Sequence, residues 1–340
     1  MSIESGEFEL IDRFISNLPK LHSKKNILLG PGDDAAHVRL HSQNMLVTTD
    51  MLIEHVHFRR DWMSDRQIGF KAMRVNISDI AAMGGAPRYA VISLGIPQKT
   101  KSQNIIQLMK GLTDAASQAG VEIIGGDTNA VPPSAPWVIS VTVMGEHTRG
   151  RVLSRAGARD GDDIYVTGFL GESALGLHLL KKIGKIKKDM VSLSNHDIQK
   201  FIHRHFIPPN RVKIGQKLAR LKGVHSMMDL SDGLVGDLGH ILRASRVGAE
   251  IYTDKIPVTY EYRKTCQKLK LDPLRLALAG GEDYELLFTV SPRVKMPHKI
   301  DGIPLTKIGK IKKSHLNRFK IINSSGEEVK IKYLSYQHRF

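Results

Sequence analysis

Acidic residues beside glycine or hydroxyl side chains recur at six places along this chain of 340 residues. Each of the six motifs stands at an expected turn between an apolar strand-like run and a helical pattern. They lie at 30–36 (GPGDDAA), 48–50 (TTD), 76–79 (NISD), 125–128 (GGDT), 229–233 (DLSDG) and 280–285 (GGEDYE). Carboxylates that converge repel one another, and burying their charge is costly unless it is paired. Six converging motifs would therefore need a cation between them.

Magnesium is the cation that this set of residues favours, because it takes hard oxygen ligands and keeps waters that phosphates can replace. The neighbouring glycines serve a second purpose, since they allow tight turns and let backbone N–H groups approach an anion. Carboxylate-bound magnesium beside glycine turns is typical of phosphoryl transfer, in which positioning and charge neutralisation supply most of the catalysis. The motifs together predict an ATP-using, magnesium-dependent enzyme.

Each motif alone also has a plain structural interpretation. An aspartate in a glycine-rich turn often only forms the turn or caps a helix. Asp79 fits a surface acid on a helix, Asp127 fits a cap at the end of a strand, and Asp237 fits a helix N-terminal acid favoured by the macrodipole. The functional interpretation therefore depends on the six motifs taken together.

Two further segments match patterns that can bind nucleotides, and a third such pattern is absent. The sequence GPGDDA at 30–35 matches the dinucleotide pattern G-x-G-x-x-A, but its two acids would repel pyrophosphate unless a metal intervened. No G-x-x-x-x-G-K-[ST] sequence occurs, which excludes a P-loop enzyme. The segment 168–176 (GFLGESALG) follows a strand and opens a helix, so it is either a phosphate site at a helix N-terminus or a tight strand-to-helix connection.

Alternation of short β-branched runs with longer helical patterns predicts a mixed α/β (α+β) protein. In the first half, strands are expected at 45–49, 89–94, 122–124 and 137–143, and helices at 67–82 and 103–118, the second ended by Gly120. The polar segment 146–160 predicts a boundary between domains at 1–150 and 151–340. In the second half, we expect strand 164–167, helices around 173–180, 211–221 and 237–245, and a hairpin at 321–331.

Composition restricts the class of protein. Hydrophobic residues make up 41% and charged residues 25%, which is ordinary for a globular protein. No stretch approaches the roughly 20 apolar residues of a membrane helix, so we expect no membrane partner. The N-terminal sequence MSIESGEFELIDRF lacks the basic start and apolar block of a signal peptide and suggests an amphipathic helix. The single Cys266 excludes an internal disulfide, so a cytoplasmic location is expected.

The net charge of +16 favours anionic partners. Lysines gather at 181–188 and 310–320, without the interleaved aromatic residues of a base-stacking surface. We interpret both segments as solvated surfaces and expect no nucleic-acid partner. The alternative, a basic nucleic-acid-binding protein, leaves the acidic motifs unexplained, because acids that face phosphates repel them.

The motifs, in this order, resemble those of the thiamine-monophosphate kinases. The similarity runs over nearly the whole chain and is carried by GEFELI at Gly6, GPGDDAA at Gly30, TTDMLIEHVHF at Thr48, NISDIAAMG at Asn76, IIGGDT at Ile123, LSRAGARDGD at Leu153, MDLSDGL at Met228 and AGGEDYEL at Ala279. The resemblance implies the two-domain fold of the aminoimidazole ribonucleotide synthetase-like superfamily. Its N-terminal domains would pair into a homodimer through a shared β-barrel, and its C-terminal domain would be α/β. ATP and Mg²⁺ would then serve the conversion of thiamine monophosphate to thiamine diphosphate.

The resemblance also implies roles for individual residues. Magnesium ligands would be Asp34, Thr48, Thr49, Asp50, Asp79, Asp127, Asp229 and Asp232, with Asp50, Asp79 and Asp127 central to catalysis. ATP would be contacted by Gly126, Asp127, Arg155 and Ser231, and thiamine monophosphate by His57, Glu282 and Tyr336. The family's usual G-[YW]-D-H-F-like ending is replaced here by SYQHRF at 335–340, where Tyr336 either stacks on the substrate or packs the C-terminus.

Transfer of the γ-phosphoryl group is expected to be direct and in line, because the acceptor phosphate is already ionised and no side-chain nucleophile is evident. Other ATP-using members of the superfamily remain alternatives, namely an aminoimidazole ribonucleotide synthetase or a hydrogenase-maturation dehydratase. A selenophosphate synthetase would need a reactive cysteine near a glycine-rich N-terminal segment, and Cys266 lies far downstream. A catalytically inactive magnesium–nucleotide sensor is a further alternative, which the apparently complete ligand set disfavours.

Overall fold

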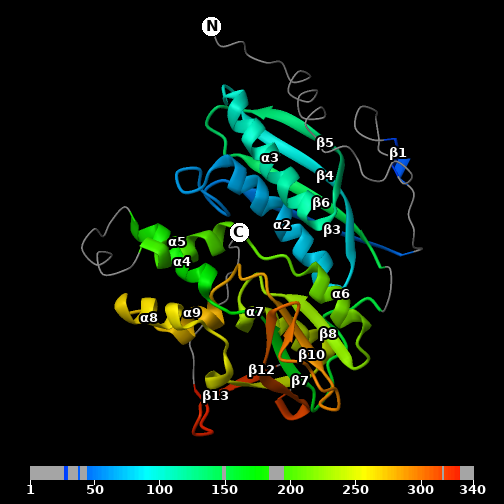
Figure 1. Cartoon of the computed structure of the whole chain (residues 1–340), viewed down its shortest axis with the longest axis vertical. Coiled ribbons are helices and arrows are strands. Elements are labelled where there is room, and N and C mark those ends of the chain that lie inside the picture. Colours follow the sequence, from blue (N-terminus) through cyan, green and yellow to red (C-terminus); the bar gives the residue numbers. More distant parts are fainter. Residues whose placement is uncertain are drawn as a thin grey trace. The chain divides into compact units, whose positions relative to one another are not determined.

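The computed structural model describes residues 27–29, 37–38, 44–147, 151–183, 195–315 and 318–329. The chain forms two compact units. Unit 1 comprises Met1–Ile80 and Gly85–Thr148, and unit 2 comprises Ala81–Gly84 and Arg149–Phe340. Figure 1 shows the helices and strands of both.

Unit 1 is built on a four-stranded sheet in the order β3-β6-β4-β5. Its strands are β3 (Met45–Ile53), β4 (Ala86–Pro97), β5 (Glu122–Val131) and β6 (Val138–Glu146). β6 runs antiparallel to both β3 and β4, whereas β4 and β5 are parallel. β3 and β5 therefore lie at opposite edges of this sheet. Two short strands, β1 (Ile27–Leu29) and β2 (His37–Val38), form a separate antiparallel pair.

Two long helices, α2 (Asp65–Ala82) and α3 (Ser102–Ala119), pack on the sheet of unit 1 (Figure 1). They cross in backbone contact, since a Cβ on Gly69 would lie 2.0 Å from the carbonyl oxygen of Leu108, and one on Gly111 would lie 1.9 Å from that of Arg66. α3 ends at Gly120, whose φ of 72° is left-handed, as the sequence predicts.

The second face of this sheet is open in the described residues. Alternate side chains of β3 point to it, and Met45, Val47 and Met51 are 46%, 57% and 53% exposed. Leu52, on the opposite face, is buried. The predicted α/β arrangement is confirmed for unit 1. The described part of a single chain contains an open sheet and no closed barrel, so the dimeric β-barrel remains a prediction.

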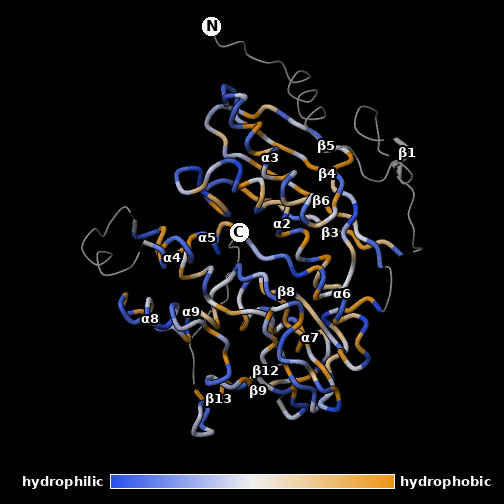
Figure 2. The backbone as a smooth tube through the Cα atoms, viewed as in Figure 1, coloured by the Kyte–Doolittle hydropathy of each residue, from blue (hydrophilic) through white to orange (hydrophobic). Residues whose placement is uncertain are grey.

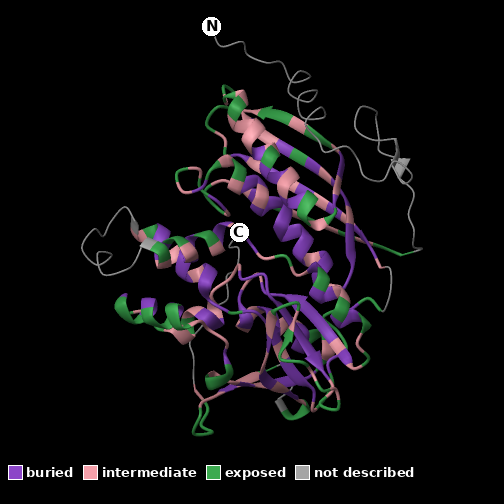
Figure 3. Ribbon diagram, viewed as in Figure 1, coloured by how far each residue is buried: buried purple, intermediate pink, exposed green. Residues whose placement is uncertain are grey.

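Unit 2 is built on a seven-stranded sheet in the order β13-β9-β12-β7-β10-β8, with β11 paired to β12. The strands are β7 (Asp163–Thr167), β8 (Val224–Asp229), β9 (Gly248–Tyr252), β10 (Leu286–Val290), β11 (Lys299–Ile300), β12 (Ile303–Lys312) and β13 (Phe319–Ile322). β13 runs parallel to β9, and every other pair in this sheet is antiparallel. β10 is buried throughout, and Figure 3 shows the strands at the centre of the sheet in the colour of buried residues.

The helices of unit 2 cover both faces of this sheet. They are α4 (Glu172–Ile183), α5 (Asn195–Phe206), α6 (Val212–Arg220), α7 (Leu234–Ser245), α8 (Tyr260–Lys268) and α9 (Pro273–Ala279), with 3₁₀ turns η2 (Thr253–Lys255) and η3 (Lys313–His315). Successive residues of β10 enter two different hydrophobic clusters: Leu287 packs with Leu238 and Ile241 of α7, and Phe288 packs with Leu218 of α6. Burial on both faces explains why β10, with the sequence LLFTV, is an almost continuous apolar run, and Figure 2 draws such hydrophobic residues in orange.

Most predicted elements of regular structure are confirmed, with longer bounds than the sequence suggested. The described residues include no helix with the length and apolar character of a membrane span. Several lysines of the segment 310–320 and its neighbours make ion pairs: Lys307 with Asp163, Lys312 with Glu250 and Lys320 with Glu328. The predicted N-terminal helix lies outside the described residues.

Candidate active site

Strand β3 and helix α2 bring the TTD and NISD motifs of unit 1 together. The Thr48 hydroxyl donates a hydrogen bond of 2.6 Å to Asp79 Oδ2. The backbone N–H of Asp50 donates to Asn76 Oδ1 at 2.9 Å, and Asn76 Nδ2 in turn donates to the carbonyl of Ala72. Thr48 and Asp50 are two residues apart on the strand, so both face the helix. The two motifs thus place two carboxyl groups and one hydroxyl in one region.

The two carboxyl groups of this region interact electrostatically. Burial, and secondly the negative charge of Asp79, raise the pKa of Asp50 from 3.8 to about 6. A half-buried carboxylate beside a second one is costly, and a bound cation would relieve that cost. The oxygen donors present are those that magnesium prefers, so the residues of this region fit a magnesium ion.

Thr49 and Asp127 face the other side of the same sheet. Thr49 donates to the carbonyl of Val141 at 3.2 Å and accepts from the hydroxyl of Thr142 at 3.0 Å. Asp127 accepts from Asn129 Nδ2 at 2.6 Å. In the sheet register, Asp127 pairs with Ser93, Ser93 with Ser140, and Ser140 with the exposed Met51. Asp127 therefore shares the open face with Met51, whereas Asp50 faces α2.

Within one chain, the sheet separates Asp127 from Asp50. Their strands are at opposite edges, three strand spacings or about 14 Å apart, and their side chains leave opposite faces. Gly126 precedes Asp127 where a Cβ would lie 2.1 Å from the carbonyl oxygen of Ile92. The structure thus brings Asp50 and Asp79 together and does not add Asp127 to them.

His57 lies in the turn that follows β3. Its Nδ1 accepts a hydrogen bond of 3.0 Å from the backbone N–H of Ile53. With Nδ1 used as an acceptor, the proton of a neutral ring is on Nε2. This contact fixes the position of the ring at the end of the strand that carries Asp50.

In unit 2, the DLSDG motif forms a turn between β8 and α7, and Asp237 holds it from inside. Oδ2 of Asp237 accepts from the backbone N–H groups of Asp232 and Gly233, both at 3.1 Å. Burial, and then the charges of Asp229 and Asp232, raise the pKa of Asp237 to about 8. Asp237 does lie in the first turn of α7, as expected, but it is only 1% exposed and supports the motif. The interpretation of Asp237 as a plain helix N-terminal acid is therefore incomplete.

Arg155 belongs to the same region of unit 2. Its side chain is exposed, and its carbonyl accepts a hydrogen bond of 3.2 Å from Ser245 at the end of α7. Burial is the largest cause of the lowered pKa of His240, and the Arg155 charge is the next, while Asp232 opposes them. Arg155 and Asp232 thus both lie close to His240, which places the arginine beside the DLSDG turn.

The GGEDYE segment lies next to the DLSDG turn. The N–H of Glu282 donates to the carbonyl of Ser231 at 2.7 Å, and the N–H of Tyr284 donates to that of Leu230 at 2.8 Å. Glu282 and Tyr284 have φ values of 64° and 48°, in the left-handed region that residues with a side chain rarely adopt. Such backbone strain persists where surrounding contacts hold it, and it is concentrated at functional sites.

Helix α5 and the segment after it fix this strained segment, which the sequence did not reveal. Both oxygens of the buried Glu285 are bound: Arg211 donates to both at 2.5 Å, Arg204 donates to Oε1 at 2.8 Å, and Thr167 donates to Oε2 at 2.6 Å. Arg204 also donates to the carbonyl of Asp283 at 2.9 Å. The segment RHFIPPNRV at 204–212, with two arginines beside a proline pair, was the available signal.

The glycine-rich segment 168–176 proves to be a strand-to-helix connection held by a carboxyl group. Asp283 accepts from the N–H groups of Gly171 at 2.8 Å and Ser173 at 3.4 Å, so it occupies the N-terminus of α4. Burial raises the pKa of Asp283 to about 7, against the opposing effect of the Arg204 charge. Of the two interpretations of this segment, the structure favours the tight connection over a phosphate site.

No group of three or more His, Cys, Asp or Glu side chains in the described part of the chain is arranged to hold a metal ion. The predicted ligands instead form an Asp50–Asp79 pair in unit 1 and the Asp229–Asp232 turn in unit 2. Asp34 and Tyr336, together with the GPGDDAA motif and the C-terminal sequence, lie outside the described residues.

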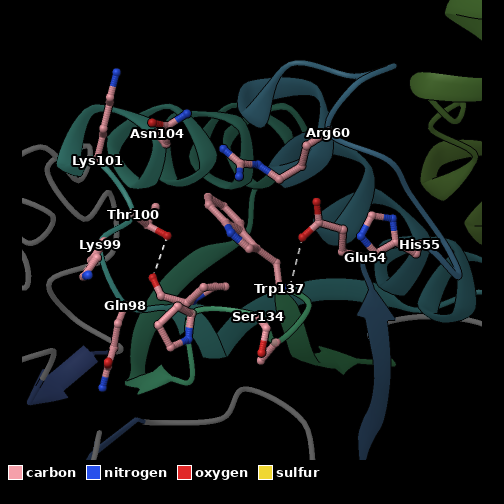
Figure 4. Close-up of a pocket in the computed structure, with 13 residues that line it drawn as sticks. Glu54, His55, Arg60, Gln98, Lys99, Thr100, Lys101, Asn104, Ser134 and Trp137 are labelled. Atoms are coloured by element: carbon pink, nitrogen blue, oxygen red, sulfur yellow. Dashed lines mark hydrogen bonds between the residues drawn. The ribbon is translucent and has the colours of Figure 1, made fainter.

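Unit 1 also contains a pocket of about 530 Å³ at the carboxyl ends of β3, β4 and β5 (Figure 4). Its inner wall is Trp137, over which the Arg60 guanidinium lies at 4.1 Å. The backbone N–H of Trp137 donates to Glu54 at 3.2 Å. Lys99 and Lys101 line the opposite side, so the basic residues favour an anionic occupant. None of the predicted site residues lines this pocket.

Comparison with known proteins relates the whole chain to one family. Residues 32–147 match the AIR synthase related protein, N-terminal domain, and residues 159–318 match the corresponding C-terminal domain. A thiamine-monophosphate kinase of Bacillus subtilis (strain 168) is 34% identical over 337 residues, covering 98% of this chain and 99% of the relative.

Solved structures give the same result. The crystal structure of thiamine-monophosphate kinase from Stenotrophomonas maltophilia K279a has a TM-score of 0.78 and 34% identity, covering 95% of this chain and 98% of that one. AaThiL complexed with AMPPCP and TMP has a TM-score of 0.74 and 33% identity, covering 98% and 97%. The fold expected from the sequence motifs is thus found in solved relatives.

Proposed function

The chain belongs to the AIR synthase related family, and within it to the thiamine-monophosphate kinases, and from this we infer that it transfers the γ-phosphoryl group of ATP to thiamine monophosphate. The observation that carries the inference is the likeness over 98% of the chain to AaThiL complexed with AMPPCP and TMP. AMPPCP is an analogue of ATP, so that complex holds a phosphoryl donor analogue. Identity of 33–34% to kinases along almost the full length favours this reaction over the superfamily alternatives.

We propose that Asp50, Asp79 and Thr48 hold magnesium in unit 1, with Asp229 and Asp232 as ligands in unit 2. Support comes from the raised pKa of Asp50, to which the charge of Asp79 contributes, and from the Thr48–Asp79 hydrogen bond, which brings a hydroxyl to the second carboxyl group. When bound, magnesium would neutralise charge on the phosphates of donor and acceptor. Asp34, Thr49 and Asp127 complete the proposed ligand set, and of these Thr49 and Asp127 leave the face of the sheet opposite to Asp50.

We propose that the other site residues bind and orient the two substrates. Gly126 lets backbone approach the nucleotide because it carries no side chain, and Arg155 offers a planar guanidinium that suits phosphate oxygens. Asp127 and Ser231 are the remaining proposed ATP contacts. His57, Glu282 and Tyr336 would contact thiamine monophosphate.

The reaction needs no nucleophile from the protein. An ionised oxygen of thiamine monophosphate attacks the γ-phosphorus of ATP, a new P–O bond forms, and the bond to the β-phosphate oxygen breaks to release ADP. The task of the side chains is to hold donor and acceptor in line, which can supply much of the rate.

We further propose that the chain forms a homodimer through the open face of the unit 1 sheet. This face carries the exposed Met45, Val47 and Met51, which are costly to leave in water. It also carries Asp127. A second copy packed on this face would cover these side chains and close the two sheets into a barrel, with Asp127 at the interface.

A substitution on the open face tests the dimer directly. Met51→Arg should give a monomer in sedimentation analysis, because a charged side chain is costly to bury between two copies. A Met51→Arg variant that sediments as a dimer would show that the chain does not pair through this face.

The proposed reaction is tested by ADP release with thiamine monophosphate, thiamine or no acceptor, each with and without Mg²⁺. We expect turnover only with thiamine monophosphate and magnesium. Preference for thiamine would refute the acceptor, and activity with an aminoimidazole ribonucleotide synthetase substrate instead would support that alternative. We also propose a cytoplasmic location, since Cys266 suits a reducing compartment.

A further inference from the structure

One histidine outside the six acidic motifs contacts a proposed substrate residue. His205 is next to the last residue of α5 and is 5% exposed. Its Nδ1 lies 3.0 Å from Glu282 Oε2 and 3.0 Å from Ser173 Oγ. All three residues belong to unit 2, so this contact is internal to one compact body.

The chemistry of the two groups determines which of them donates the hydrogen bond. An ionised carboxylate only accepts hydrogen bonds, so Nδ1 must carry the proton that lies between His205 and Glu282. The Ser173 hydroxyl can accept from the same N–H, and the buried serine thereby limits rotation of the imidazole. A buried ring with two polar partners on one nitrogen has a single orientation.

The contact acts on the side chain of Glu282 rather than on its backbone. The backbone segment is already tied by the Glu282 N–H to Ser231, by Arg204 to the Asp283 carbonyl, and by the ion pairs of Glu285. The Glu282 side chain itself is 27% exposed, so it can still reach a ligand. Removing the ring nitrogens would therefore remove the 3.0 Å contact to the carboxylate and leave the left-handed backbone in place.

We propose that His205 is a positioning residue: its Nδ1–H holds the Glu282 carboxylate in the orientation that receives thiamine monophosphate. This rests on the proposed function, which assigns Glu282 to that substrate. Preorganisation of this kind lowers the entropy lost on binding, because the carboxylate does not have to be ordered by the ligand.

Substitutions at one helix position test the role. His205→Phe keeps the ring and removes both nitrogens, His205→Gln places its amide near Nε2, and His205→Asn places an amide nitrogen near Nδ1. His203→Phe is the matched control, because His203 is exposed on the same helix. We expect the Phe and Gln variants to raise the KM for thiamine monophosphate about tenfold, with kcat and the KM for ATP within about twofold. The Asn variant should recover most of the loss.

Coupling to Glu282 separates positioning from a general structural effect. In a Glu282→Gln background, His205→Phe should add little to the KM, because the carboxylate that it positions is gone. The proposal is overturned if the two effects multiply, if His205→Phe matches His203→Phe, or if Glu282→Gln leaves the KM for thiamine monophosphate unchanged.

A spectroscopic measurement on the folded wild type does not depend on turnover. Long-range ¹H–¹⁵N NMR should show the Nδ1-protonated form of His205, with a nitrogen shift that changes in Glu282→Gln. Absence of that signature refutes the positioning role even if the variants fail to fold. A protein with the signature but without turnover of thiamine monophosphate would refute the proposed function and leave the contact standing.

Discussion

Replacing Asp50 with asparagine should make the metal-free protein more stable and the enzyme nearly inactive. Burial and the neighbouring Asp79 raise the pKa of Asp50 from 3.8 to about 6. That rise corresponds to about 3 kcal/mol by which the ionised carboxyl opposes folding at neutral pH. Asparagine carries no charge, and the backbone N–H of residue 50 can still donate to Asn76. Because the amide also has to be desolvated, we expect a net gain of about 1–2 kcal/mol in the free energy of unfolding.

The raised pKa of Asp50 also predicts how the free energy of unfolding changes with pH. Because the folded-state pKa lies above the unfolded value, the folded protein binds this proton more tightly, and the free energy of unfolding falls as pH rises between about 4 and 7. The difference between variant and wild type should therefore be small at pH 4 and largest at pH 7. In contrast to its effect on stability, Asp50→Asn should impair catalysis and reduce kcat about 100-fold or more, because a magnesium ligand is lost.

Urea unfolding followed by circular dichroism, in EDTA and at pH 4 and pH 7, measures the stability difference. Addition of Mg²⁺ should stabilise the wild type more than Asp50→Asn. Asp61→Asn is the matched control, since Asp61 is exposed and forms a salt bridge with the exposed Arg59. A variant that is no more stable than wild type at pH 7, or one with near-normal kcat, would contradict the assigned electrostatics or the metal role respectively.

Three other perturbations have expected outcomes. Burial raises the pKa of Asp283 to about 7, so the free energy of unfolding should fall as the pH rises from about 4 to 7. Asp283→Asn should flatten this pH dependence when denaturation is measured at several pH values. An unchanged pH dependence would contradict the raised pKa. Gly168→Ala should lower the free energy of unfolding by about 3 kcal/mol or more, measured by thermal unfolding, because φ is 61° and the new Cβ would lie 2.2 Å from Glu285 Oε1. Gly161→Ala is the control, since Gly161 also has a positive φ but open space around the position of a Cβ. Equal losses of stability in the two variants would refute the steric argument. Burial raises the pKa of the Cys266 thiol to about 11, so iodoacetamide at pH 8 should modify the unfolded protein and not the native protein, as measured by mass spectrometry. Rapid modification of Cys266 in the native protein would contradict its burial.

Local patterns were enough to predict much of the fold. Helix 67–82 is visible from its apolar spacing, and the end of the next helix is visible from Gly120. β5 was underestimated, because Gly125 and Gly126 interrupt the β-branched pattern although the strand continues to Val131. Glycine gives no side-chain signal in a strand, so only pairing with β4 reveals the full length.

The candidate site was predictable in its residue types and less so in its grouping. The sequence shows that Asp50 and Asp127 each lie near a strand, but it does not show that their strands occupy opposite edges of the sheet. Likewise, nothing local marks His205 as a partner of the distant Glu282, and the burial of Asp237, which lies only four residues after Gly233, depends on the packing of the whole unit. The strand order and the face of each residue were the missing information.

The ion cluster at Glu285 has a consequence for how unit 2 assembles. Its carboxylate joins Thr167, Arg204 and Arg211, which lie 118, 81 and 74 residues away along the chain. A partly formed cluster would leave an uncompensated charge in an apolar interior, so intermediates that contain only some of these segments are disfavoured. β7, β10, α5 and α6 are therefore expected to form in a single cooperative transition, and this unit should fold slowly for its size because so many of its decisive contacts are distant.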